Sequence, residues 1–276
     1  MIQFGLRAHD FGRASAEELA AKISEKGFTN IQLTVEEAIA GMEDTFGKLS
    51  PGLARFIGDA FHRKSIQIGV LSCYINPVDP DKEARRKQIN HFKEYVRYAR
   101  DFGCSIVATE TGSVNRDFSF HPENHGTEAF KTFIGSLEEM VAEAEKFGVL
   151  VGIEGVAAFV VNSPETIRKM LDTVKSNHLQ IIFDPVNLLT VEHYSECDKM
   201  IEKSFDLFGD RIAAFHAKDF IVESNMLKPV QIGRGMMNYQ RIIRLLEKYK
   251  PYINFIMEDV DIHVVDSNLN YLRSCL

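Results

Sequence analysis

Four side chains that can bind a metal ion each follow a short apolar run in this chain. The runs are LVGIEG, LQIIFDP, RIAAFHAKD and YINFIMED, and the polar residues that they deliver are Glu154, Asp184, His216 and Glu258. Near-continuous apolar runs are typical of parallel strands, which are covered on both faces. Three carboxylates with one imidazole suit Mn²⁺, Mg²⁺ or Co²⁺ and tolerate Zn²⁺. We expect these residues to bind one divalent ion, with Mn²⁺ preferred.

Carboxylates grouped around a cation can also transfer protons, because the cation and the neighbouring carboxylates separate their pKa values. The ion would polarise a substrate carbonyl and hydroxyl oxygen, while Glu154 and Glu258 act from opposite sides of the adjacent carbon. The expected reaction is an isomerisation or epimerisation by proton transfer through an enediolate. Loss of water from a polyol ketone begins with the same proton abstraction, so a dehydratase is the alternative.

Further polar residues follow the apolar runs and are candidates for substrate binding. Lys218 can contact substrate or an oxyanion, or it can form an ion pair with Asp219 or Glu258. Asn187 fits a substrate contact and a turn equally well. Glu110 is expected to support the metal ligands. His9 and Tyr74 are further candidates for contact with the substrate. Arg234 is also a candidate, although its Gly-Arg-Gly segment favours a turn over an anion contact.

The elements that must position these residues alternate along the chain. Apolar runs are predicted to be strands, and helix signals separate them; the expected strands are 2–6, 30–34, 66–72, 105–112, a run ending at 154, a run ending at 184, 212–215 and a run ending at 258. Expected helices begin near Ser15, Asp81, Gly126, Ser163, His193, Asn238 and Asp266, and one more runs from after Gly52 through about Lys64. Residues 220–235 are expected to form a loop.

This alternation predicts one (β/α)8 TIM barrel that spans residues 1–276 as a single domain. A closed barrel brings the ends of all its strands to one mouth, whereas an open doubly wound sheet would spread them along a line too wide for one ion. The chain contains no G-x-G-x-x-G or P-loop sequence.

Composition narrows the class of partner. The net charge of −7 has the wrong sign for binding nucleic acid, and no stretch reaches the roughly 20 apolar residues of a membrane span. The four cysteines form no C-x-x-C pair, and no signal peptide is evident, so a cytoplasmic location is expected. Aromatic residues at helical spacing indicate core or the surface of a homo-oligomer, and they are Phe92, Tyr95, Tyr98 and Phe102.

The motifs together resemble the xylose isomerase-like TIM barrel superfamily, which contains sugar phosphate isomerases and epimerases. The motifs are GIEG, FDPVN, FHAKD and IMED, and Asp-Pro-x-Asn followed by His-x-Lys-Asp is the most specific part. The resemblance implies a single metal site at Glu154, Asp184, His216 and Glu258, with the two Glu residues as acid and base. It also implies a small carbohydrate as the substrate.

Two other classes of function remain open at this point. Metal-dependent apurinic endonucleases share the barrel, but the acidic charge and the lack of several strand-end histidines count against a phosphodiesterase. A metal-binding or sugar-binding protein without turnover is also compatible with the same residues, because ligands do not prove chemistry.

Overall fold

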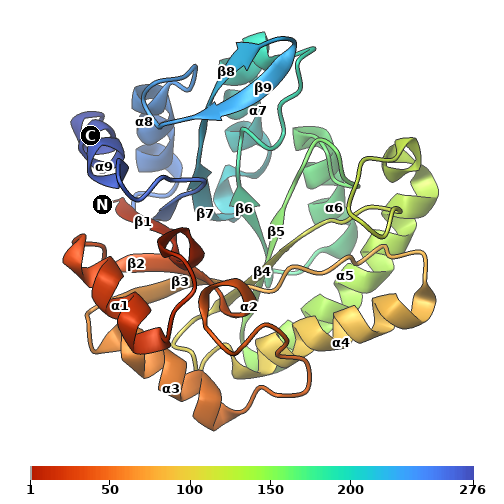
Figure 1. Ribbon diagram of the computed structural model, residues 1–276. Coiled ribbons are helices and arrows are strands. Elements are labelled where there is room, and N and C mark those ends of the chain that lie inside the picture. Colours follow the sequence, from red (N-terminus) through yellow and green to blue (C-terminus); the bar gives the residue numbers. More distant parts are fainter. Residues whose placement is uncertain (1) are drawn as a thin grey trace.

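Eight parallel strands close into a barrel in the computed structural model, which describes residues 2–276 (Figure 1). Neighbours around the barrel follow chain order, and β1 pairs with β10 to close the ring. The strands are β1 (Gln3–Arg7), β2 (Asn30–Thr34), β3 (Gln67–Ser72), β4 (Ile106–Glu110), β5 (Leu150–Glu154), β6 (Leu179–Phe183), β7 (Ile212–Ala217) and β10 (Asn254–Met257). The predicted (β/α)8 barrel is confirmed.

Helices surround the barrel and connect successive strands. They are α1 (Ala16–Glu25), α2 (Val35–Ala38), α3 (Pro51–His62), α4 (Lys82–Tyr98), α5 (Thr127–Phe147), α6 (Pro164–Val174), α7 (Cys197–Phe208), α8 (Tyr239–Tyr249) and α9 (Val265–Ser274). Short 3-10 turns complete the connections: η1 (Ala8–Phe11), η2 (Pro122–His125), η3 (Tyr194–Glu196) and η4 (Gly209–Arg211).

Local sequence signals fix several helix ends. Ser15 and Glu18 form a reciprocal capping box at the start of α1, and Asp81 accepts hydrogen bonds from two backbone N–H groups at the start of α4. Ser163 caps α6, whose first residue is proline. Gly148, with φ 61°, ends α5 in the left-handed region that glycine adopts without strain.

The segment after β7 is a β-hairpin, so the prediction of a loop over 220–235 is wrong for most of its length. Strands β8 (Asp219–Glu223) and β9 (Met226–Val230) pair antiparallel and project beyond the barrel above β7 (Figure 1). Ser224 and Asn225 form the two-residue turn with φ values of 51° and 58°. Paired positive φ values match the right-handed twist of the strands, and asparagine tolerates them.

The core lies in two layers. Most buried apolar side chains pack between the barrel and the helices, and Phe92, Tyr95 and Phe102 belong to this layer. A smaller cluster on β3, β4, β6 and β7 forms a separate layer, and its buried members are Val70, Ile106, Ala108, Ile182 and Ala214. The four cysteines are free. No helix within residues 2–276 has the length and apolar character needed to cross a bilayer.

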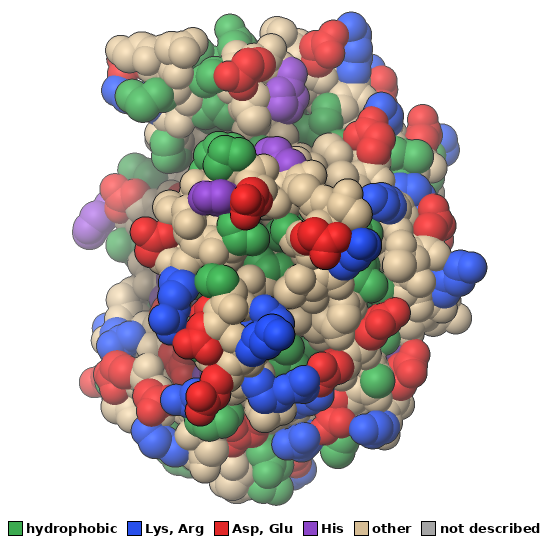
Figure 2. All heavy atoms as spheres, turned by 90° about the vertical axis from the view of Figure 1, so that its right-hand side faces the viewer, with side chains coloured by type: hydrophobic (Ala, Val, Ile, Leu, Met, Phe, Trp, Pro, Cys, Tyr) green, Lys and Arg blue, Asp and Glu red, His purple; other side chains and the backbone are tan. Residues whose placement is uncertain are grey.

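The side of the molecule formed by α4, α5 and α6 carries basic and acidic side chains intermixed (Figure 2). Arg97 donates to Glu143 at 2.6 Å, and Lys93 contacts Glu139 at 2.9 Å across the α4 and α5 pair. Mixed signs at this spacing are typical of a solvated surface rather than of a site for a polyanion.

Candidate metal and catalytic site

The four residues singled out by the sequence lie together at the carboxyl ends of β5, β6, β7 and β10. Their ligand atoms all fall within 4.8 Å of one another, and all four side chains are buried. Side chains two positions apart in a strand lie on the same face. Asp184 therefore lies on the face of Ile182, and His216 on the face of Ala214, and this is the face that carries the smaller apolar cluster. Glu154, Asp184, His216 and Glu258 are called the four-residue cluster below.

His216 directs one ring nitrogen into the cluster. Its Nε2 donates to Gln32 Oε1 at 2.7 Å, because an amide oxygen can only accept. Nδ1 therefore faces the carboxylates, 3.0 Å from Glu258 Oε1 and 3.3 Å from Glu154 Oε2. Gln32 is oriented in turn by donating from Nε2 to the Tyr74 hydroxyl at 3.1 Å.

Two buried atoms of the cluster suit a bound cation. Within residues 2–276, His216 Nδ1 and Asp184 Oδ2 form no hydrogen bond of standard geometry, and their near neighbours are ion-pair contacts with Glu258 and Lys218. Asp184 uses its other oxygen to accept backbone N–H bonds from Val186 and Asn187 at 2.8 and 3.1 Å. An imidazole lone pair and three carboxylates around one centre form a ligand set that fits a divalent ion.

Lys218 and Asn187 join the cluster. The Lys218 ammonium lies 3.0 Å from Asp184 Oδ2 and 2.7 Å from Glu258 Oε2. It also donates to Asn187 Oδ1 at 3.1 Å, and Asn187 Nδ2 donates to Glu154 Oε1 at 2.6 Å. These contacts link three of the four cluster residues through one ammonium and one amide.

Charge and burial shift the pKa values of the cluster in opposite directions. Burial alone would raise the pKa of Glu258, but His216, Lys218 and Arg7 lower it to about 2. Burial outweighs Lys218 at Asp184 and raises its pKa to about 6. Burial would lower the pKa of His216, yet Glu258 and Glu154 raise it to about 9. Without a metal ion, the site therefore carries its positive charge on His216 and Lys218.

Glu110 lies opposite Glu154 in the pairing of β4 with β5. Burial and the charges of Glu154 and Glu258 raise the pKa of Glu110 to about 8. This carboxyl group is therefore mostly protonated at neutral pH and can donate a hydrogen bond.

The other predicted substrate contacts lie at different distances from the cluster. The Tyr74 hydroxyl reaches it through Gln32, as described above. His9 lies in η1 and contacts Glu37 at 3.3 Å. Arg234 is exposed in the turn after β9 and takes no part in the contacts of the four-residue cluster among residues 2–276.

Sequence reasoning missed Gln32, Arg7 and Asp10. Arg7 ends β1 and lies 3.0 Å from Asp10 and 3.9 Å from Glu258. The rule that polar residues at strand ends are candidates would have found Arg7. Gln32 gave a different signal, because it is a polar residue within a strand whose five residues are all buried.

Asp219 holds the turn that contains Arg234. Its carboxylate accepts backbone N–H bonds from four residues at 2.9 to 3.0 Å, and these are Phe220, Gly233, Gly235 and Met237. A Cβ atom at Gly235 would clash with this carboxylate, and Gly233 has a φ of 84°. The Gly-Arg-Gly segment is therefore a turn, as its sequence favours.

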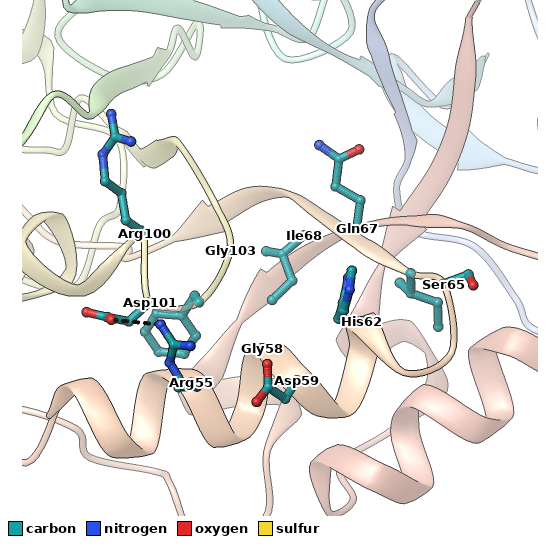
Figure 3. A pocket seen from close by; sticks show the side chains of 12 residues that line it. Arg55, Gly58, Asp59, His62, Ser65, Gln67, Ile68, Arg100, Asp101 and Gly103 are labelled. Atoms are coloured by element: carbon teal, nitrogen blue, oxygen red, sulfur yellow. Dashed lines mark ion pairs between the residues drawn. The ribbon is translucent and has the colours of Figure 1, made fainter.

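A pocket of about 520 Å³ opens at the opposite end of the barrel, near the amino ends of β3 and β4 (Figure 3). Arg55 pairs with Asp101 at 3.9 Å, and Arg100 donates to the Phe147 carbonyl. Because active sites of these barrels lie at the carboxyl ends of the strands, this pocket is not the candidate site.

Residues 17–275 match the model of one protein family, described as the xylose isomerase-like TIM barrel. Two curated relatives match this chain at low sequence identity. A protein of Methanocaldococcus jannaschii is 23% identical over 254 residues, covering 90% of this chain and 80% of that protein. A Mycoplasma pneumoniae protein named probable L-ribulose-5-phosphate 3-epimerase is 22% identical over 183 residues, covering 64% of this chain and 54% of that protein.

Solved structures share the fold at low sequence identity. A D-tagatose 3-epimerase-like protein superposes with a TM-score of 0.77 and 19% identity, covering 99% of this chain and 96% of that chain. A Mycobacterium smegmatis protein in complex with magnesium has a TM-score of 0.74 at 17% identity, covering 94% and 87%. The IOLI protein with a zinc atom has a TM-score of 0.70 at 13% identity, covering 99% and 96%.

Proposed function

Since the chain belongs to the xylose isomerase-like TIM barrel family, we propose that it is a divalent-metal-dependent isomerase or epimerase of a sugar, a sugar phosphate or a related polyol. The observation that carries this proposal is the convergence of Glu154, Asp184, His216 and Glu258 within 4.8 Å. Similarity to a D-tagatose 3-epimerase-like structure and to a protein named probable L-ribulose-5-phosphate 3-epimerase supports this proposal.

The four-residue cluster would hold the ion, with His216 binding through Nδ1 and Mn²⁺ as the preferred metal. When bound, the cation would supply positive charge beside the two substrate oxygens on which negative charge develops. Mg²⁺, Co²⁺ and Zn²⁺ are the alternative ions for the same ligand set.

Glu258 and Glu154 would exchange the proton with the substrate carbon. The lowered pKa of Glu258 keeps this carboxylate ionised, which is the form that can accept a proton. The bond from Asn187 holds Glu154 in place, and Lys218 and Asn187 are placed to contact substrate oxygens. Glu110, His9, Tyr74 and Arg234 are proposed as further substrate contacts.

A polyol-ketone dehydratase is the alternative, because it would use the same proton abstraction. A phosphodiesterase is disfavoured by the single histidine of the cluster. A binding protein without turnover would retain the metal and release no altered product.

Exchange of solvent deuterium into ketoses tests the proposal. With Mn²⁺ bound, deuterium should enter the carbon beside the carbonyl of a true substrate, as followed by NMR. Appearance of a dehydrated product would instead favour the dehydratase. Metal binding without any exchange across a panel of ketoses and ketose phosphates would favour a binding protein.

Glu258→Gln sharpens this test. Removing the proton-accepting oxygen should abolish exchange, and the fold should persist because the residue lies at the mouth rather than in the barrel core. Glu223→Gln, on the exposed end of β8, is the matched control and should exchange normally. An unaltered exchange rate in Glu258→Gln rejects its acid-base role.

A further inference from the structure

The positive charges near the mouth of the barrel are largely engaged by carboxylates. The loops that follow the barrel strands contain six Lys or Arg residues, namely Arg13, Lys48, Arg116, Lys218, Lys228 and Arg234. Among residues 2–276, all of these except Arg234 lie within ion-pair distance of a carboxylate. Except at Arg234, a phosphate group at the mouth would have to compete with these internal partners.

Arg7 lies at the end of β1 beside the cluster and has three acidic neighbours. Its guanidinium contacts Asp259 at 2.6 Å, Asp10 at 3.0 Å and Glu258 at 3.9 Å. Three acidic neighbours around one partly buried arginine leave no unbalanced positive charge there.

Lys218 is balanced in the same way. It faces Asp184 and Glu258, and its charge together with that of a dication would match the three carboxylates of the four-residue cluster. A substrate dianion would therefore meet a site whose formal charges already cancel.

The glycine-rich turn near Arg234 cannot serve as an anion nest either. Backbone N–H groups at such turns often bind phosphate. Here the N–H groups of Gly233 and Gly235 donate to Asp219 Oδ2 at 2.9 and 3.0 Å. A carboxylate of the chain itself occupies the position that a phosphate would take.

We propose that the substrate is an uncharged polyhydroxy ketone rather than its phosphate ester. The inference rests on the proposed function and narrows its substrate class. Hydroxyl groups can donate to the acidic side chains around Arg7, whereas a phosphate would be repelled by Asp10 and Asp259.

Turnover is compared first on matched pairs, such as fructose with fructose 6-phosphate and ribulose with ribulose 5-phosphate. With Mn²⁺ bound, kcat/KM for deuterium exchange should be at least about tenfold higher for the free ketose, since misplaced charge is costly to bind. Equal or faster exchange into the phosphate overturns the proposal. Exchange into neither member of any pair counts against the proposed function instead.

Binding is measured separately, so that the inference does not depend on turnover. Glucitol and glucitol 6-phosphate lack the carbonyl and cannot react, and calorimetry on the metal-loaded protein gives both affinities. Glucitol should bind more tightly than its phosphate. Tighter or equal binding of the phosphate, or no binding of glucitol, contradicts the inference.

Asp259→Asn tests the charge argument directly. Asp259 has a φ of 54°, which asparagine tolerates, and the change removes one carboxylate from Arg7. The affinity of glucitol 6-phosphate relative to glucitol should rise by about threefold, the size of a partly exposed ion pair. Asp261→Asn is the control, because it removes a nearby carboxylate that accepts the His263 backbone N–H and is not one of the ion-pair partners of Arg7. An unchanged ratio in Asp259→Asn, or an equal rise in the control, argues against charge exclusion.

Discussion

Gln32 sets the orientation of His216 by accepting its Nε2–H at 2.7 Å, and both side chains are buried. The partner of the second ring nitrogen decides which nitrogen is free to bind a metal. Tyr74 orients Gln32 in turn, so a chain of three side chains from β2, β7 and the residues after β3 directs His216 Nδ1 into the cluster.

Gln32→Leu should weaken metal binding. Without an acceptor for Nε2–H, the imidazole can rotate or protonate the wrong nitrogen, and loss of such a partner typically costs about tenfold in affinity. Titration calorimetry with Mn²⁺ measures the effect. Gln67→Leu, at an exposed position on β3, is the control and should bind as the unaltered chain does. Equal affinities for both variants would show that the hydrogen bond does not position His216.

The cluster residues were predictable because each one ends an apolar run in a barrel whose strand ends must meet. Gln32 was not, since its partner His216 lies 184 positions away in the chain and nothing local marks the pair. Arg7 follows the strand-end rule, but its partners do not. Asp10 lies in the turn after β1, and Asp259 lies 252 positions away with a positive φ beyond β10, which no local pattern indicated.

At the scale of elements, Asp219 joins β8 to the turn before α8. One buried carboxylate satisfies four backbone N–H groups that would otherwise lack partners within this turn. The hairpin thus begins at a residue fixed by the chain 14 to 18 positions later.

Asp219→Asn should destabilise the fold by about 3 kcal/mol, because hydrogen bonds to a charged acceptor are lost and an amide N–H would face backbone donors. Urea unfolding measures the change in free energy of unfolding. The exposed Asp261→Asn variant should change it by less than about 0.5 kcal/mol. A small effect in Asp219→Asn would mean that water replaces the carboxylate.

Strand and helix positions were predicted better than the hairpin. Apolar runs and capping residues such as Ser15, Asp81 and Ser163 mark element ends through local chemistry. The hairpin has only half-buried or exposed residues after Phe220, and its Ser224-Asn225 turn lacks the glycine that usually signals such a turn. Its strands were therefore not distinguishable from a loop.

At the scale of the whole molecule, the cluster couples stability to pH. Glu110, Asp184 and His216 have pKa values raised to about 8, 6 and 9. A group whose pKa is raised by folding stabilises the fold below its unfolded pKa and loses that stabilisation as pH rises through its folded pKa. Glu258 acts in the opposite sense, with its stabilisation lost as pH falls from about 4.5 toward 2.

The metal-free protein should therefore lose thermal stability between about pH 5 and 9. With saturating Mn²⁺ the trend should reverse, because protons compete with the ion for the same atoms. Tm is measured by calorimetry at pH 6 and pH 9, once with chelator and once with Mn²⁺. These values give the change of Tm with pH for the metal-free and the Mn²⁺-loaded protein. Parallel slopes in both conditions would contradict a metal site in the cluster.

Lys218 also bears on how the proposed ion would enter the cluster. Three carboxylates this close would repel one another in a newly made chain, but the ammonium spans Asp184 and Glu258 and acts as a built-in counter-ion. The barrel can thus fold with the cluster balanced by Lys218 and no metal bound. If the cluster binds an ion as proposed, loading would be an exchange, in which Lys218 would give up its contacts with Asp184 and Glu258 and His216 would release its proton.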